Sequence, residues 1–157
     1  MNRSYRILLL ILAMVGCARP SPQSPTLESD CTLGPGFSSA FERLFLSNEP
    51  LRYQDNVAFL EAICPAELGV EDKDLVKTRL IQFLSLTVQD REFAPDSEHT
   101  GVASEIAFLR LQAVQLLGEV GTKEDIEFIQ SLLATAEGEH PLFEDACKNA
   151  VDQLHDR

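Results

Sequence analysis

The stretch Leu109-Arg110-Leu111-Gln112-Ala113-Val114-Gln115-Leu116-Leu117-Gly118-Glu119-Val120-Gly121 decides the fold class of this 157-residue chain. Its apolar residues recur every three or four positions, as they do along one face of an α-helix, and they continue a stripe that starts at Val102. Gly121 then ends the helix, and Thr122 is followed three residues later by Asp125, which is the spacing of an N-terminal capping box. The stretch therefore predicts a long amphipathic helix that is followed at once by another helix.

The same periodicity predicts five further helices, and no segment alternates convincingly as a half-buried strand would. These helices are centred on residues 37–45, 57–63, 76–87, 126–136 and 143–154. Asp55 is expected to cap the second of them, and Pro141 is expected to open the last one. Residues 89–101 are mostly polar and predict an exposed loop. The chain is therefore expected to be all-α, with about six helices.

Three of the apolar stripes align with one another. Residues 76–84 align with 109–117 at an offset of 33, and 109–117 align with 143–151 at an offset of 34. Self-similarity at such a period is typical of helical solenoids. The pattern Leu109-Arg110, Ala113-Val114, Leu116-Leu117-Gly118 and Val120-Gly121 resembles the first helix and turn of HEAT repeats, and residues 126–133 resemble the second helix.

The HEAT resemblance implies a short array of helix pairs over residues 31–157, with one extended face for a partner. A second helix should follow Leu84 in such an array, yet residues 89–101 are too polar to form one. An irregular bundle with a repeat-like C-terminal half is therefore the alternative.

The beginning of the chain predicts export. Two arginines precede nine apolar residues, 7–15, and a small residue stands directly before Cys17. Nine apolar residues are too few to cross a bilayer as a helix, which takes about 20. Residues 13–17 resemble the lipobox of bacterial lipoproteins. The resemblance implies that residues 1–16 are a signal peptide and that Cys17 is lipidated.

Residues 17–30 are rich in Pro and Ser and predict a tether between the lipidated cysteine and the domain. In Gram-negative lipoproteins an aspartate after the lipidated cysteine tends to retain the protein in the inner membrane. This chain has Ala18 there, which favours the outer membrane, with the domain in the periplasm. An ordinary signal peptide with an incidental cysteine is the alternative.

The mature chain is expected to be strongly acidic. Its 25 acidic residues would face 11 basic ones once Arg3 and Arg6 leave with the signal, so about 14 negative charges would remain. Such a surface disfavours nucleic acids and anionic lipid headgroups as ligands. Membrane contact is therefore expected through the acyl chains alone.

Export also permits disulfide bonds. If the first two helices are antiparallel, Cys64 returns towards Cys31, and a Cys31–Cys64 bridge would stabilise the domain by roughly 3–4 kcal/mol by restricting the unfolded chain. Two inert thiols are the alternative. Cys147 lies on the apolar stripe of the last helix and is expected to be a small buried residue.

No motif singles out a catalytic centre, a metal or a cofactor. His99, His140 and His155 lie far apart and are expected to be solvated, and no Cys/His spacing fits zinc. The acidic loop lacks the glycine and the terminal glutamate of an EF-hand. We therefore expect no cofactor and no enzymatic activity, and an unrecognised hydrolase is the rival hypothesis.

The leading hypothesis is a protein-interaction or scaffold module. The residues expected to contact a partner are exposed positions on the repeat helices and in the acidic loop, namely Arg110, Gln112, Gln115, Glu119, Glu92 and Glu98. In size and layout alone the chain also resembles pilotins, which are small helical lipoproteins that escort secretin subunits to the outer membrane. A closed pocket with converging polar groups would favour a hydrolase, whereas an open surface would favour binding.

Overall fold

A computed structural model describes residues 33–47, 53–86, 102–136 and 139–157, and the fold is all-α, as predicted. The helices are α1 (Phe37–Phe41), α2 (Tyr53–Glu61), α3 (Val70–Leu84), α4 (Val102–Val120), α5 (Ile126–Leu133) and α6 (Phe143–His155). A π-helical turn, Glu42–Leu46, continues α1, and a 3-10 turn, Lys123–Asp125, leads into α5. No helix in these four segments is long and apolar enough to span a bilayer.

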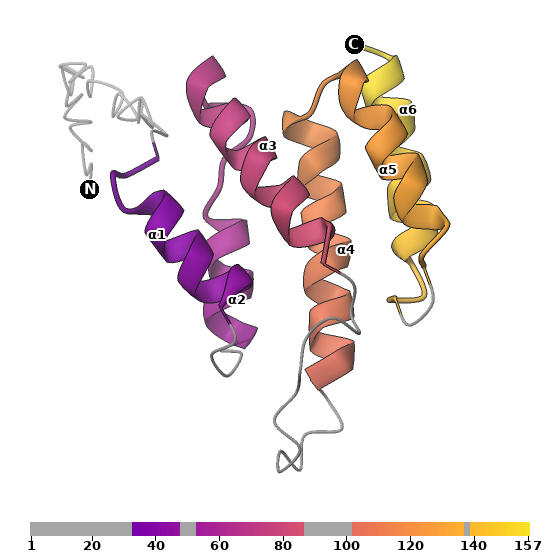
Figure 1. The fold of residues 1–157 in the computed structure, drawn as a ribbon. Helices are drawn as coiled ribbons and strands as arrows, with labels where there is room; N and C mark the ends of the chain where they lie inside the picture. Colours follow the sequence, from indigo (N-terminus) through magenta and orange to yellow (C-terminus); the bar gives the residue numbers. More distant parts are fainter. Residues whose placement is uncertain (1–32, 48–52, 87–101, 137–138) are drawn as a thin grey trace, which may run out of the picture.

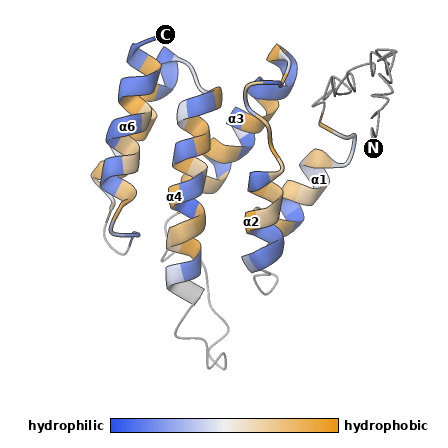
Figure 2. Ribbon diagram, turned by 180° about the vertical axis from the view of Figure 1, so that it is seen from behind, coloured by the Kyte–Doolittle hydropathy of each residue, from blue (hydrophilic) through white to orange (hydrophobic). Residues whose placement is uncertain are grey.

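The six helices form two layers (Figure 1). One layer consists of α2, α4 and α6, which face the viewer in Figure 2, and the other consists of α1, α3 and α5. The central helix is α4, which packs against α2, α3 and α6. Its position explains why its apolar residues extend beyond a single stripe, since a helix that is covered on several sides must be apolar on several sides.

The neighbouring helices α4 and α6 run in the same direction. The Arg110 guanidinium lies 5.8 Å from the ring centroid of Phe143, and two turns further along α4 the backbone of Gly118 lies against Ala150. Contacting residues are thus separated by 32 or 33 positions, close to the offset of 34 between residues 109–117 and 143–151. This part of the predicted internal repeat corresponds to two adjacent parallel helices.

The helix α3 does not stand in the position that its alignment with α4 implies. The Leu84 carbonyl oxygen, at the end of α3, lies 3.0 Å from Arg110 Nη1 in the middle of α4. Lys77 Nζ, earlier in α3, lies 3.9 Å from Asp125 Oδ2, just beyond the end of α4. The two helices therefore run in opposite directions, and α3 belongs to the other layer. The helix α3 follows α2 and forms the second helix of an α2–α3 pair, so no further helix needs to follow Leu84.

The core lies between the two layers. On α4, Leu109, Ala113, Val114 and Leu117 are fully buried. At the α1 end the core is aromatic instead (residues 37–59). The ring centroids of Phe41 and Phe45 are 4.5 Å apart in a stacked pair, and Phe83 of α3 meets Phe45 edge-on at 5.1 Å. Such ring pairs add specific geometry to the apolar burial that holds the layers together.

The predicted helix boundaries are confirmed at one position and wrong at two. The Asp125 carboxylate accepts a hydrogen bond from the Thr122 N–H at 2.7 Å, so the predicted capping box is present. Asp55 is not the cap of α2, because the helix begins two residues earlier and places this carboxylate in its first turn. There it still interacts favourably with the helix dipole. Pro141 precedes α6 by two residues, and Leu142 is the residue before the helix.

Candidate functional site

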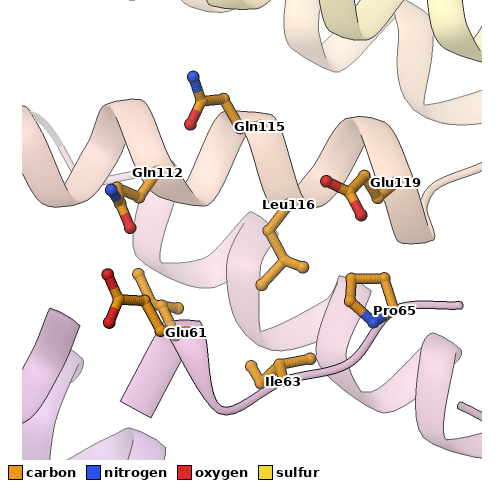
Figure 3. Close-up of a pocket in the computed structure, with 8 residues that line it drawn as sticks. Glu61, Ile63, Pro65, Gln112, Gln115, Leu116 and Glu119 are labelled. Carbon is orange, nitrogen blue, oxygen red and sulfur yellow. The ribbon is translucent and has the colours of Figure 1, made fainter. Parts of the chain in front are cut away.

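A shallow, open hollow of about 170 Å³ lies between α2 and α4 (Figure 3). Its lining residues come from the end of α2, the segment that follows it, and α4, and they are Leu60, Glu61, Ile63, Pro65, Gln112, Gln115, Leu116 and Glu119. In Figure 3, Gln112 and Leu116 point from α4 towards the α2 side, whereas Gln115 points away from it. We call the surface formed by these eight residues the α2–α4 face.

Three of the residues predicted to contact a partner lie together on this face. Gln112, Gln115 and Glu119 are spaced by three and four positions, so they share one side of α4. Gln115 and Glu119 are exposed, and Gln112 is half-buried. The residues that border the hollow from the α2 side were not predicted, because their distance in sequence from α4 gives no signal of contact.

The exposure predicted for Arg110 is wrong. Its side chain is 2% exposed, and its Nε donates a hydrogen bond to Glu139 Oε1 at 2.6 Å. Its Nη1 donates to the carbonyl oxygens of Leu84, the last residue of α3, and of Leu86, two residues further on. Arg110 is therefore a structural residue that ties α4 to α3 and to the approach to α6, and it does not belong to the α2–α4 face.

Burial controls the chemistry of two ionisable groups near Arg110. Burial raises the pKa of the Glu139 carboxyl above its usual 4.5, and the Arg110 charge opposes this shift. Burial also raises the pKa of the Cys147 thiol to about 11, and Cys147 is fully buried. The expectation that Cys147 is a small buried residue is confirmed, and its thiol stays protonated near neutral pH.

A row of three aromatic rings lies towards the other end of α4. Phe108 is 6.1 Å from Tyr53 of α2 and 5.9 Å from His140, measured between ring centroids. His140 was predicted to be solvated, but its ring is half-buried against Phe108. Phe108 lies one turn before Gln112, so the row continues the α2–α4 face along the same side of α4.

The helices α2 and α4 have an excess of acidic residues. Residues 53–69, which form α2 and the segment after it, contain three acidic residues and no basic one. The helix α4 contains two acidic residues and one basic residue, the buried Arg110. By contrast α3, in the other layer, contains three acidic and three basic residues, so its charges balance. The α2–α4 face therefore presents negative charge that no basic side chain of its own helices balances.

Several predicted site residues lie outside the described part of the chain. They are Cys17, Cys31, Glu92, Glu98 and His99. The Cys31–Cys64 bridge therefore stays a prediction, and Cys64 itself is exposed. Within the described segments, no group of three or more His, Cys, Asp or Glu side chains could hold a metal ion. No family model matches the chain, and neither a curated protein nor a solved structure matches it.

Proposed function

We propose that this chain is a membrane-anchored lipoprotein whose helical domain binds a protein partner through the α2–α4 face. The open hollow between α2 and α4 carries this proposal. Its floor is apolar, with Leu60, Ile63 and Leu116 each less than 10% exposed, and its border is polar and charged. A small apolar centre within a polar rim is the usual composition of a protein-binding surface.

The openness of the hollow supports binding over hydrolysis. A hydrolase needs a concave site that holds catalytic groups around the substrate and the attacking water. The α2–α4 hollow is open to solvent, and the polar side chains directed towards it are one amide, Gln112, and two carboxylates on different sides of it. We therefore propose a scaffold or interaction module and no catalytic activity.

Successive helices alternate between the two layers, and this arrangement supports a HEAT-like scaffold. Parallel neighbours in one layer, joined through antiparallel helices in the other, are what stacked helix pairs produce. Such an array offers one face over several helices to a partner. Lipidation of Cys17, with residues 18–30 as a tether, would hold that face in the periplasm near the outer membrane.

Photo-crosslinking in native membranes tests the proposed face. A photoreactive amino acid at Gln115 lies on the α2–α4 face, and the same amino acid at Gln130 lies on α5 in the other layer. Both glutamines are exposed, so the two positions are matched. We expect a reproducible adduct of one size from Gln115 and none from Gln130. Equal adducts from both positions, or none from Gln115, would contradict the proposed face.

Membrane fractionation tests the anchor separately. A Cys17→Ser variant cannot form the thioether to the lipid, so we expect it in the soluble fraction, whereas the unchanged chain sediments with the membranes. A Cys17→Ser chain that has lost residues 1–16 and still sediments would exclude lipidation at this residue as the anchor.

A further inference from the structure

We infer that the α2–α4 hollow takes one apolar side chain of a partner segment in which that residue is flanked by lysine or arginine. The inference rests on the proposed function and specifies the chemistry of the partner at the same face. It follows from the size of the hollow, from its apolar floor, and from the charges at its border.

The size and the floor of the hollow define the apolar part of the ligand. An apolar cavity of about 150 Å³ holds a molecule of benzene, so a hollow of about 170 Å³ has room for one aliphatic or aromatic side chain. Leu60, Ile63 and Leu116 supply the apolar contacts. Because the hollow is shallow, it cannot bury a second large side chain.

The two glutamates at the border define the charged part of the ligand. Glu61 and Glu119 are exposed, and neither forms an ion pair with another described residue. The one arginine on α4, Arg110, is already paired with Glu139. A basic side chain of the ligand would therefore meet two carboxylates that are not engaged in an ion pair, and an acidic one would be repelled.

The Gln112 amide completes the recognition of a peptide. Gln112 lies over the hollow in Figure 3 and has both a carbonyl oxygen and an NH₂ group. It can therefore accept from a peptide N–H and donate to a peptide carbonyl. The end of α4 beside Glu119 is held in place, because the Arg157 Nη2 donates to the Glu119 carbonyl oxygen at 2.7 Å.

The test uses short fluorescent peptides with the full chain in detergent. The probe has Lys-Leu-Arg at its centre in a Gly/Ser background, and two matched peptides have Glu-Leu-Glu or Lys-Gly-Arg instead. Fluorescence anisotropy measures the dissociation constants. We expect the Lys-Leu-Arg peptide to bind, the Lys-Gly-Arg peptide to bind more weakly, and the Glu-Leu-Glu peptide not to bind. Added salt should weaken binding, because exposed charges are screened.

Three single substitutions locate the binding. Glu61→Gln and Glu119→Gln should each raise the dissociation constant of the Lys-Leu-Arg peptide by about two- to five-fold, as expected for one exposed ion pair. Glu127→Gln removes the same charge from the exposed surface of α5 and should leave the dissociation constant unchanged. All three positions are exposed, so thermal melts of the variants should match that of the unchanged chain.

Three results would overturn the inference. One is the absence of binding by the Lys-Leu-Arg peptide. Another is equal binding of the Lys-Gly-Arg peptide, which would mean that the hollow is not used. The third is an equal loss from Glu127→Gln, which would mean that only net charge attracts the peptide. If the Lys-Leu-Arg peptide does not bind while the Gln115 adduct still forms, this inference is wrong and the proposed function stands. If both fail, both are wrong.

Discussion

Arg110 Nε lies 2.6 Å from Glu139 Oε1, and the two side chains are only 2% and 3% exposed. Through the same guanidinium, Arg110 Nη1 donates to the Leu84 carbonyl oxygen at 3.0 Å. One side chain on α4 thus binds the end of α3 and the residues before α6. The second carboxylate oxygen, Glu139 Oε2, is buried and has no hydrogen-bond partner. The buried charge of Arg110 is therefore compensated by its hydrogen bonds, whereas one oxygen of the Glu139 carboxylate accepts none.

Replacing Arg110 by alanine should cost a large part of the stability. Arg110→Ala leaves a buried carboxylate without its counter-charge and removes the donors to the end of α3. Breaking a buried ion pair from one side typically costs about 3–5 kcal/mol. Urea denaturation of the variant and of the unchanged chain measures the difference in the free energy of unfolding.

Arg79→Ala is the matched control for this prediction. Arg79 pairs with Glu42 at 3.0 Å, and the Glu42 side chain is 58% exposed. Pairs of this kind contribute about 0–1 kcal/mol. If Arg79→Ala and Arg110→Ala lower the free energy of unfolding equally, the structural role assigned to Arg110 is wrong.

Replacing Glu139 by glutamine should cost less stability at neutral pH than Arg110→Ala does. It should also change the pH dependence of stability. Burial raises the pKa of Glu139 above 4.5 in the folded state, so the folded chain binds this proton more tightly than the unfolded chain does. Its stabilising contribution is complete below pH 4.5 and is lost as the pH rises through the folded pKa. The stability of the unchanged chain relative to Glu139→Gln should therefore increase from neutral pH towards pH 4.5.

Glu144→Gln reverses the sign of that pH dependence. A hydrogen bond and the charge of Lys148 lower the pKa of Glu144 below 4.5. Its contribution is therefore present above pH 4.5 and is lost as the pH falls through the folded pKa. Denaturation of both variants at pH values above and below 4.5 distinguishes the two pH dependences. Slopes of the same sign would contradict the burial argument for Glu139.

Helical periodicity could place Gln115 and Glu119 correctly but not Arg110. Periodicity shows which side of a helix is apolar, and it cannot show how many neighbours cover the remaining sides. Because α4 is covered by α2, α3 and α6, a position beside the apolar stripe is buried. The partner of Arg110, Glu139, is 29 residues away, and no local pattern connects them. The all-α class was predictable because it depends on periodicity alone.

The position of α3 could not be obtained from its apolar pattern. Helices of both layers turn an apolar stripe towards the same core, so their sequences resemble one another whichever direction they run. The alignment of residues 76–84 with 109–117 therefore reflects a shared environment and not an equivalent position. By contrast, the alignment of 109–117 with 143–151 corresponds to real neighbours, since Gly118 of α4 contacts Ala150 of α6.

Adding a methyl group at Gly118 should destabilise the contact between α4 and α6. A Cβ there would lie 2.9 Å from the Ala150 Cα, which is backbone and cannot rotate away. Glycine to alanine within a helix usually gains about 0.5–1 kcal/mol, but overpacking costs about 1–3 kcal/mol. We expect Gly118→Ala to lower the free energy of unfolding. Gly34→Ala, where a Cβ meets nothing within 4 Å, should change it little. A stabilising Gly118→Ala would disprove the close approach.

The Cys147 thiol should resist alkylation while the domain is folded. Cys147 is fully buried, and burial raises the pKa of its thiol to about 11, so little reactive thiolate forms near neutral pH. Mass spectrometry after iodoacetamide treatment should find Cys147 unmodified in buffer and modified beyond the urea midpoint. Rapid modification in buffer alone would show that this part of the core opens without global unfolding.

Removing the Arg157 side chain should loosen the end of α4. Its guanidinium donates to the carbonyl oxygens of Gly118 at 3.0 Å, Glu119 at 2.7 Å and Gly121 at 3.0 Å. Carbonyls at the end of a helix have no partner in a following turn, and a positive charge there also interacts favourably with the helix dipole. Arg157→Ala should lower the free energy of unfolding by about 1 kcal/mol and speed amide exchange in the last turn of α4. Lys148→Ala, which removes only an exposed pair within α6, should change neither, and an equal effect would contradict the capping role.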